Sequence, residues 1–159
     1  MRIRVSTEIN STPEQVWDLM CNAHRYPEWV TVTDRMVEAP DGPVGAGSVY
    51  REYGGIPPFK GESRWEVTEF EPTRRQVHVG DDGSMTMHLE ILIEPAPNGT
   101  LLTQNLEFTP RWWLRPMAML MWPLLMGRRG KAAIVQTQAN AKRLLESAGA
   151  AAQAQGGSN

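Results

Sequence analysis

The chain opens with a strict alternation of apolar and polar residues. The side chains of Ile3, Val5, Thr7 and Ile9 fall on one face of an extended segment over 2–10, and polar or charged side chains fall on the other. This period of two predicts a strand with one face buried and the other in water.

A short helix pair is predicted directly after this strand. Thr12 suits the N-cap, Pro13 suits the first helical position because its missing N–H would be unpaired there, and Gln15 completes a capping box. Apolar residues at helical spacing continue this helix to Met20, and Tyr26–Trp29 forms the second member of the pair.

A run of further strands follows. The clearest lies over 59–70, where Phe59, Trp65 and Val67 alternate with charged or polar residues. Short turns separate the strands, which favours an antiparallel sheet because parallel neighbours would need crossover helices. We predict strands at 30–39, 48–53, 59–70, 75–79, 85–93 and 101–109, and a loop at 54–58.

The last part of the chain changes to a helical period. Pro116 and Pro123 break its first part. The pattern then predicts one long helix over 131–147 with Gly149 as its stop, followed by a tail over 149–159 that frays.

Composition and charge limit the functions open to this protein. Its 159 residues, 41% hydrophobic and 21% charged, fit one soluble domain, which we place at 1–148. The net charge of −2 gives no electrostatic reason to expect a nucleic acid partner. Cys21 is the single cysteine, which excludes an internal disulfide, and we find no signal peptide, so we expect a cytoplasmic protein. No apolar stretch is long enough to span a bilayer.

This order of elements resembles the helix-grip fold of the START-like (SRPBCC) superfamily. The resemblance covers residues 1–148. It rests on the Pro13–Met20 helix, the Tyr26–Trp29 segment, the Trp65–Val67 strand with Glu71 and Pro72 closing it, and the last helix at Ala141–Glu146.

The resemblance implies an α+β fold. A curved antiparallel sheet of about seven strands would wrap around a long C-terminal helix, with two short helices after the first strand and a cavity inside. Members include pollen allergens, polyketide aromatase/cyclases, coenzyme Q-binding proteins and lipid-transfer domains, which share a cavity and not a catalytic motif. The resemblance therefore implies a hydrophobic ligand and leaves the activity open.

One charged residue is expected to approach this cavity from the strand that begins at Ser48. The more apolar face of this strand includes Arg51 and Tyr53, which would bring Arg51 inside, where it needs an acceptor. The opposite register would instead bury Glu52 with Tyr50. A structural Arg–Glu pair or exposure at a sheet edge explains such a residue equally well.

The other candidates for the cavity lining are polar or large apolar residues on otherwise apolar faces. Ser63 and Gln104 would supply polar contacts. Aromatic and methionine side chains would supply contact area, although ordinary core packing explains them too. These apolar candidates are Trp29, Tyr53, Trp65, Met85, Met87, Trp112 and Met119.

Reactive and metal-binding residues are scarce. Cys21 and His24 lie close enough along a helix to touch, but at this position we expect a buried, inert thiol. We expect His78 and His88 to point to solvent, and the spacing of the three histidines predicts no zinc site. The segment 127–131 lacks the spacing and the hydroxyl residue of a phosphate-binding loop, so we expect no metal and no cofactor.

The segment Pro116–Met126 is apolar on every side and must be covered by something. The sheet, a bound ligand, a second subunit or a membrane surface could each cover it. Arg111 and Arg115 precede its apolar centre, and Arg128 and Arg129 follow it, which is the arrangement expected of an interfacial membrane segment. Packing of a gripped helix against the sheet is the alternative.

Three functions follow from these observations. The first is binding of a lipid, isoprenoid or aromatic polyketide, with Arg51, Gln104 and Tyr53 orienting its oxygens. The second is a reaction of the polyketide cyclase/aromatase type, in which Arg51 polarises a carbonyl and Tyr53 or Glu52 moves protons. The third is docking on a membrane or a protein, a second copy of the chain included, through Pro116–Met126.

Overall fold

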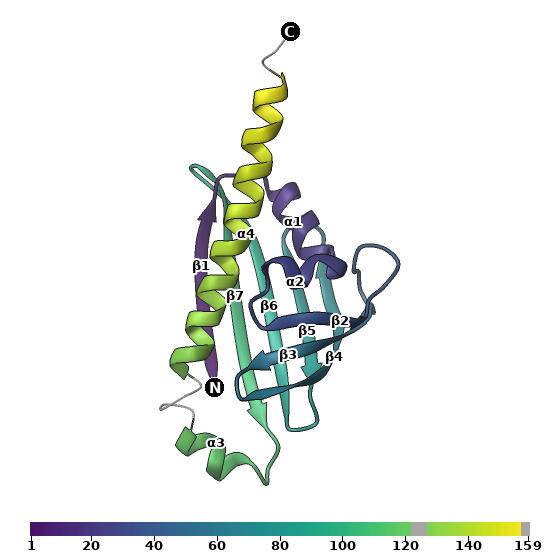
Figure 1. Ribbon diagram of the computed structural model, residues 1–159, viewed down its shortest axis with the longest axis vertical. Coiled ribbons are helices and arrows are strands. Elements are labelled where there is room, and N and C mark those ends of the chain that lie inside the picture. The colour runs from purple at the N-terminus through teal and green to yellow at the C-terminus, as the bar shows by residue number, and fades with distance from the viewer. Residues whose placement is uncertain (122–126, 157–159) are drawn as a thin grey trace.

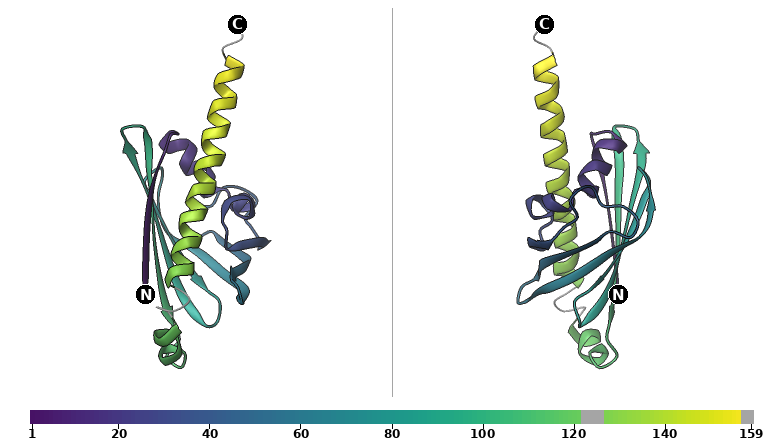
Figure 2. Two further views of the ribbon diagram at one scale, coloured as in Figure 1. Left: turned by 60° about the vertical axis from the view of Figure 1, so that its left-hand side comes forward. Right: turned by 90° about the vertical axis from the view of Figure 1, so that its right-hand side faces the viewer.

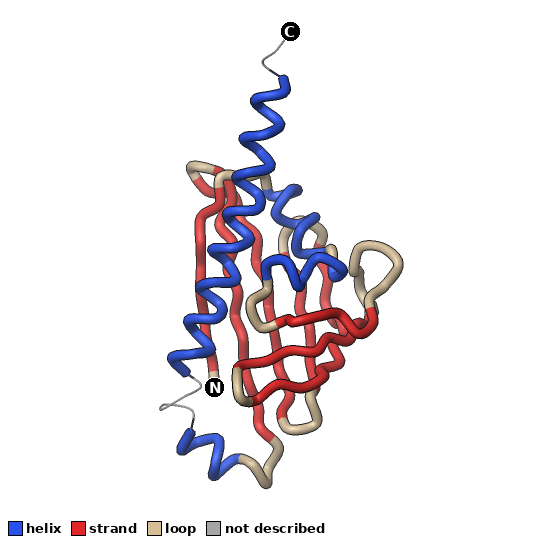
Figure 3. The backbone as a smooth tube through the Cα atoms, viewed as in Figure 1, coloured by secondary structure: helices blue, strands red, loops and turns tan. Residues whose placement is uncertain are grey.

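The computed structural model describes residues 1–121 and 127–156 and has the predicted α+β architecture. Seven strands form one antiparallel sheet in the order β1-β7-β6-β5-β4-β3-β2, so the first strand pairs with the last (Figures 1 and 3). The elements are β1 (Arg2–Ile9), α1 (Pro13–Cys21), the 3₁₀ turn η1 (Ala23–Arg25), α2 (Tyr26–Trp29), β2 (Thr33–Glu38), β3 (Val49–Ile56), β4 (Phe59–Glu71), β5 (Arg75–Asp81), β6 (Met85–Ala96), β7 (Gly99–Pro110), α3 (Arg115–Met121) and α4 (Gly127–Gly156).

The predicted start of α1 is confirmed in atomic detail. The Thr12 hydroxyl accepts a hydrogen bond from the backbone N–H of Gln15 at 3.3 Å, and Gln15 Oε1 accepts one from the backbone N–H of Thr12 at 3.0 Å. These two bonds satisfy backbone donors that the first helical turn would otherwise leave unpaired. They fix the point at which the chain leaves β1 and crosses over the sheet.

Strand β3 is longer than predicted, because the segment expected to form a loop at 54–58 is partly paired. Gly54 and Gly55 allow this extension. A Cβ on Gly54 would lie 1.9 Å from the carbonyl oxygen of Val32, and Gly55 has a φ of +127° that favours glycine. The backbone of β2 and β3 can therefore approach closely at this point.

The sheet curves toward α1, α2 and α4, which all lie on its concave side (Figure 2). The strand register aligns Tyr50, Trp65, Gly80, Met87 and Phe108 in one row across five strands. Tyr50, Trp65 and Met87 are buried, so this row belongs to the concave face. Residues one position away along each strand point to the convex face, because side chains alternate along a strand.

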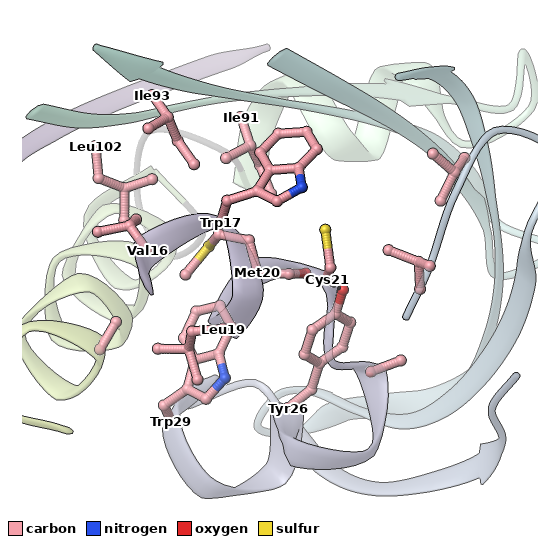
Figure 4. Close-up of a cluster of buried hydrophobic side chains, with 14 of the residues drawn as sticks. Val16, Trp17, Leu19, Met20, Cys21, Tyr26, Trp29, Ile91, Ile93 and Leu102 are labelled. Carbon is pink, nitrogen blue, oxygen red and sulfur yellow. Dashed lines mark hydrogen bonds between the residues drawn. The ribbon is translucent and has the colours of Figure 1, made fainter. Parts of the chain in front are cut away.

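The densest part of the core lies where α1 covers β6 and β7 (Figure 4). Val16 and Met20 of α1 are fully buried, and they share one apolar cluster with Ile91, Ile93 and Leu102. Full burial of each such side chain stabilises the fold by roughly 1.5–3 kcal/mol. This packing anchors the helix pair to the upper half of the concave face.

Helix α4 is longer than predicted at both ends. It begins at Gly127 and continues through Gly149 to Gly156, so the predicted helix stop and the frayed tail are wrong for residues 149–156. A glycine inside a helix costs only about 1 kcal/mol relative to alanine. The alanine-rich sequence on both sides of Gly149 offsets that cost.

One face of α4 packs along β1 and closes one side of the concave face. Ile134 and Ala141 are buried on this face. Gln138 joins the two elements by two hydrogen bonds: its Oε1 accepts from the Thr7 hydroxyl at 2.6 Å, and its Nε2 donates to the Val5 carbonyl at 3.1 Å.

Candidate functional site

A hydrogen-bonded chain of three buried side chains lies on the concave face. The Tyr50 hydroxyl is 2.9 Å from His78 Nδ1, and His78 Nε2 is 2.9 Å from Gln76 Oε1. Because an amide oxygen can only accept, His78 Nε2 carries the proton, and the unprotonated Nδ1 accepts from Tyr50. Burial lowers the pKa of His78 to about 4, which keeps the ring neutral near pH 7. The chain of donors therefore runs from Tyr50 through His78 to Gln76.

Three polar atoms in the interior have no hydrogen-bond partner among the described residues. They are Nε1 of Trp29, Nε2 of Gln76 and Oε1 of Gln104, and none of these residues is more than 3% exposed. Gln76 and Gln104 lie in the same row of the sheet, on either side of Ile91. An unsatisfied buried polar group costs about 1–3 kcal/mol. Gln76 Nε2 lies beside the Cys21 thiol, so Trp29 Nε1 and Gln104 Oε1 are the donor and the acceptor left for a polar group that could reach them.

Glu52 is the charged residue that approaches the interior. Its Oε1 accepts a hydrogen bond from Trp65 Nε1 at 2.8 Å, and its Oε2 accepts one from the Thr33 hydroxyl at 2.6 Å. Burial raises the pKa of Glu52, and these two hydrogen bonds oppose the rise only in part. Burial therefore favours the protonated form of this carboxyl group more than solvent would.

Four aromatic rings connect the helix pair to the sheet beside these polar groups. The ring of Tyr26 lies 5.7 Å from that of Trp29 and 5.5 Å from that of Tyr50, edge to face in both cases, and Tyr50 stacks on Trp65 at 6.3 Å. All four residues are buried. These edge-to-face and stacked contacts form one buried aromatic cluster between the helix pair and the sheet.

The thiol of Cys21 is not activated. Burial raises its pKa to about 12, the charge of Asp18 adds to the rise, and the neighbouring amide of Gln76 opposes it. His24 does not pair with the thiol, since its Nε2 lies 2.9 Å from the Pro40 carbonyl oxygen. The burial of this cysteine, predicted from the sequence, is confirmed, and its lack of reactivity stays a prediction.

Arg51 and Tyr53 lie outside the interior, so their placement in the cavity lining is wrong, and of the two registers left open the one that turns Tyr50 and Glu52 inward is observed. Arg51 forms an ion pair with Glu62 on the convex face at 2.7 Å, and its side chain is 46% exposed. Tyr53 shares that face, where the guanidinium of Arg35 lies 4.8 Å from the centre of its ring. The opposite register is favoured because it gives Tyr50 its partners on the concave face.

Two of the predicted lining residues are far from the interior. Trp112, in the turn before α3, is 78% exposed, and Met119 of α3 is 75% exposed. Neither side chain contributes to the concave face. The expectation that they line a cavity is therefore wrong for the described structure, and the rest of the apolar segment from 122 to 126 lies outside the described residues.

The remaining predicted lining residues lie on the concave face or in the core behind it. Ser63 is opposite Glu52 in the sheet, and Gln104 is opposite Ile91. The others are Trp29, Trp65, Met85 and Met87, all of which belong to the main apolar cluster or pack against it. A role in ligand binding stays a prediction for each of them.

The sequence pattern misassigns His78 and Gln76. His78 is fully buried, so the expectation that it points to solvent is wrong, whereas His88 is exposed as predicted. The pattern misleads because Val77 is buried on the convex face, which makes that face resemble the core side. Gly80 is the signal that could have corrected this: it has the same strand parity as His78, and it leaves room for the large ring of an inward-facing tryptophan.

The convex face carries a separate groove of about 510 Å³. Its charged side chains satisfy one another: Arg75 pairs with Glu69 and with Glu90, and Glu90 also accepts a hydrogen bond from Asn105. Because its lining is charged and already paired, this groove is a poor match for an apolar guest.

The described residues contain no group of three or more histidine, cysteine, aspartate or glutamate side chains placed to hold a metal ion. Among the helices of residues 1–121 and 127–156, none combines the length and the apolar character needed to cross a bilayer.

Comparison with known proteins identifies a family. The model of a family described as "polyketide cyclase / dehydrase and lipid transport" matches residues 1–142, which is most of the chain. Among curated protein sequences, none matches.

Solved structures share the fold. The di-domain ARO/CYC protein StfQ from the steffimycin biosynthetic pathway superimposes with a TM-score of 0.75 at 13% identity, over 94% of this chain and 51% of StfQ. TTHA0849 from Thermus thermophilus gives a TM-score of 0.73 at 14% identity, over 93% of this chain and 99% of that one. MLL2253 from Mesorhizobium loti gives 0.65 at 17% identity, over 92% and 97%. At these identities the likeness concerns the fold alone.

Proposed function

The chain belongs to the polyketide cyclase/dehydrase and lipid transport family, and from this premise we propose that it binds a hydrophobic small molecule between its concave face and α4. The guest would be a lipid, an isoprenoid or an aromatic polyketide. Apolar side chains on the concave face support this, because Met85, Leu89, Leu106 and Phe108 are only partly buried although they face the helix side. Covering them would add about 25 cal/mol for each Å² removed from water.

The observation that carries this proposal is the unpartnered acceptor of Gln104 in the interior. Gln104 Oε1 has no donor among the described residues, and Gln104 is 3% exposed. A guest that carries a hydroxyl group on an apolar body would satisfy it. The near-parallel rings of Tyr50 and Trp65 suit a planar or chain-like body. The guest is therefore expected to be mostly apolar with few oxygens.

Gln104→Leu tests this assignment, because the change should affect stability and binding in opposite directions. Removing the unpaired acceptor should raise the free energy of unfolding by up to about 1 kcal/mol. It should also weaken binding of a hydroxyl-bearing guest by about tenfold, which corresponds to one lost hydrogen bond. Asn105→Leu is the matched control, since Asn105 is the next residue of β7 and points to the convex face.

The binding measurement uses native mass spectrometry with oleate, farnesol and 1,8-dihydroxyanthraquinone, one compound for each class of guest. We expect the wild-type protein to retain at least one of these compounds. Gln104→Leu should retain that compound more weakly, and Asn105→Leu should retain it as well as the wild type does. Retention of none of the three contradicts the proposal. Equal retention by both leucine variants removes Gln104 from the site.

A second substitution asks whether the guest sits on the concave face at all. Leu106→Trp should fill space on that face and reduce retention of the guest. Leu101→Trp makes the same change on the same strand, on the convex side, and should leave retention as it is in the wild type. If both variants bind equally well, the guest lies elsewhere.

A cyclase reaction is the second candidate function, and the environment of Glu52 favours it. This carboxyl group reaches the concave face, and burial raises its pKa, as proton transfer to or from a poly-β-ketone would require. Glu52→Gln can keep both hydrogen bonds, because the glutamine oxygen accepts from Trp65 and its nitrogen donates to Thr33. Loss of cyclised product with intact retention of the guest would support catalysis. An unchanged product profile would remove this candidate.

A further inference from the structure

A group of large apolar side chains is exposed at one end of the molecule. Figures 1 and 2 show α3 beyond the end of the sheet, next to the first turn of α4. In the turn before α3 and in α3 itself, the exposed fractions are 78% for Trp112, 58% for Trp113, 55% for Met117, 75% for Met119 and 68% for Leu120. Exposed apolar residues concentrated in this way indicate an interaction site.

The same part of the chain carries an unusual charge distribution. Residues 108–145 contain seven arginines and lysines and no acidic residue, whereas the rest of the chain contains nine arginines and lysines against eighteen acidic residues. Five of the seven lie at the end where α3 is found: Arg111, Arg115, Arg128, Arg129 and Lys131. All five are exposed. A protein with a net charge of −2 thus presents a cationic end.

Few acidic groups neutralise this end. Arg111 pairs with Asp81 at 2.7 Å. Asp82 uses its Oδ1 to accept three hydrogen bonds within its own turn. Arg115, Arg128, Arg129 and Lys131 form no ion pair with any acidic side chain of the described residues. These four cations remain available to an anionic partner.

We propose that the α3 surface, which consists of residues 111–120 and 128–131, docks on an anionic lipid membrane. Tryptophan and methionine side chains next to arginines and lysines match the two layers of a membrane interface, where apolar groups enter the acyl boundary and cations meet lipid phosphates. The surface binds the membrane peripherally.

A second copy of this chain fits the surface less well. An isologous dimer through the α3 surface would place the cationic residues of one subunit against those of the other, and juxtaposed like charges oppose association. By contrast, each cation on the surface raises the affinity of the protein for an anionic bilayer by about fivefold. The positive charge therefore favours an anionic membrane over a second copy of the chain, whereas the exposed apolar residues alone would fit either partner. This proposal does not depend on the nature of the interior guest.

Co-sedimentation with vesicles tests the proposal on the full chain. We expect binding to vesicles of phosphatidylcholine with 30% phosphatidylserine, weakening as salt is raised, and no binding to pure phosphatidylcholine. The double variant Arg128→Gln/Arg129→Gln should bind about 25-fold more weakly, since each charge contributes about fivefold. Trp112→Ser/Met119→Ser should lose about tenfold or more, because its apolar anchors are gone.

Matched controls change the same chemistry on other surfaces. Arg74→Gln/Arg143→Gln removes two exposed cations, and Val37→Ser removes an exposed apolar side chain. Both controls should bind as the wild type does. No binding to anionic vesicles, or equal losses in control and α3 variants, would overturn the proposal. So would a dimer in analytical ultracentrifugation that Trp112→Ser/Met119→Ser abolishes, because the α3 surface would then be a contact between subunits.

Discussion

Replacing His78 by asparagine should flatten the dependence of folding stability on pH in the weakly acidic range. His78 is fully buried, accepts a hydrogen bond from Tyr50 and donates one to Gln76. Burial holds its pKa at about 4, against 6.5 for an exposed histidine. Asparagine retains an acceptor for the Tyr50 hydroxyl but cannot be protonated. The substitution therefore removes the titration while it keeps part of the hydrogen bonding.

The sign of the effect follows from the lowered pKa. As pH falls, the unfolded chain binds the proton first, so the stability that neutral His78 contributes is complete above about pH 6.5 and is lost as pH falls toward 4. For these two pKa values the titration of His78 alone should lower the free energy of unfolding of the wild-type protein by about 2.5 kcal/mol between about pH 7.5 and pH 4.5. Glu52 opposes this trend because its pKa is raised, but it is present in both proteins and cancels in the difference.

Urea unfolding at four pH values between about 7.5 and 4.5, monitored by circular dichroism, measures the slope of the free energy of unfolding against pH. His78→Asn should be less stable than the wild type near neutral pH, with a gap that narrows as the pH falls. His88→Asn is the matched control, because His88 is exposed in the folded protein, and its slope should equal that of the wild type. If His78→Asn keeps the wild-type slope, the buried neutral ring inferred from the hydrogen-bond chain is refuted.

Two further substitutions test the concave face. Tyr50→Phe leaves a buried ring nitrogen without its donor and should lower the free energy of unfolding by about 1–3 kcal/mol in urea denaturation, whereas Tyr53→Phe, on the convex side, should change it by less than about 0.5 kcal/mol. Gly80→Ala places a Cβ 2.7 Å from the ring of Trp65 and should cost about 1–3 kcal/mol, whereas Gly61→Ala, with no heavy atom within 4 Å of its Cβ, should be nearly neutral. Equal losses for the two tyrosine variants would contradict the assigned faces, and equal losses for the two glycine variants would contradict the close contact between Gly80 and Trp65.

Most of the fold could be predicted from local pattern. Period-two alternation locates the strands, and Thr12, Pro13 and Gln15 locate the start of α1, because each of these signals depends on neighbouring residues only. The end of α4 could not be predicted in this way. Gly149 is a common helix stop, but the alanines around it continue the helix at little cost.

The site was harder to predict because strand parity depends on partners that are distant in sequence. The apolar content of the strand pointed Arg51 inward. The observed register instead follows from Tyr50, which finds His78 on β5 twenty-eight residues later. The orientation of His78 is likewise hidden by Val77, which is buried on the opposite face. The orientations of Arg51 and His78 were both mispredicted because, where both faces of a strand are partly buried, apolar content does not distinguish the inner face from the outer one.

The most direct test of an apolar guest on the concave face uses nuclear Overhauser contacts to methionine methyl groups. The protein would carry ¹³C-methyl methionine and be loaded with the best binder among oleate, farnesol and 1,8-dihydroxyanthraquinone. We predict contacts from the guest to Met85 and Met87, which face the concave side, and none to Met117 and Met119, which are exposed on α3. Contacts confined to Met117 and Met119, or to no methionine at all, would contradict an interior guest.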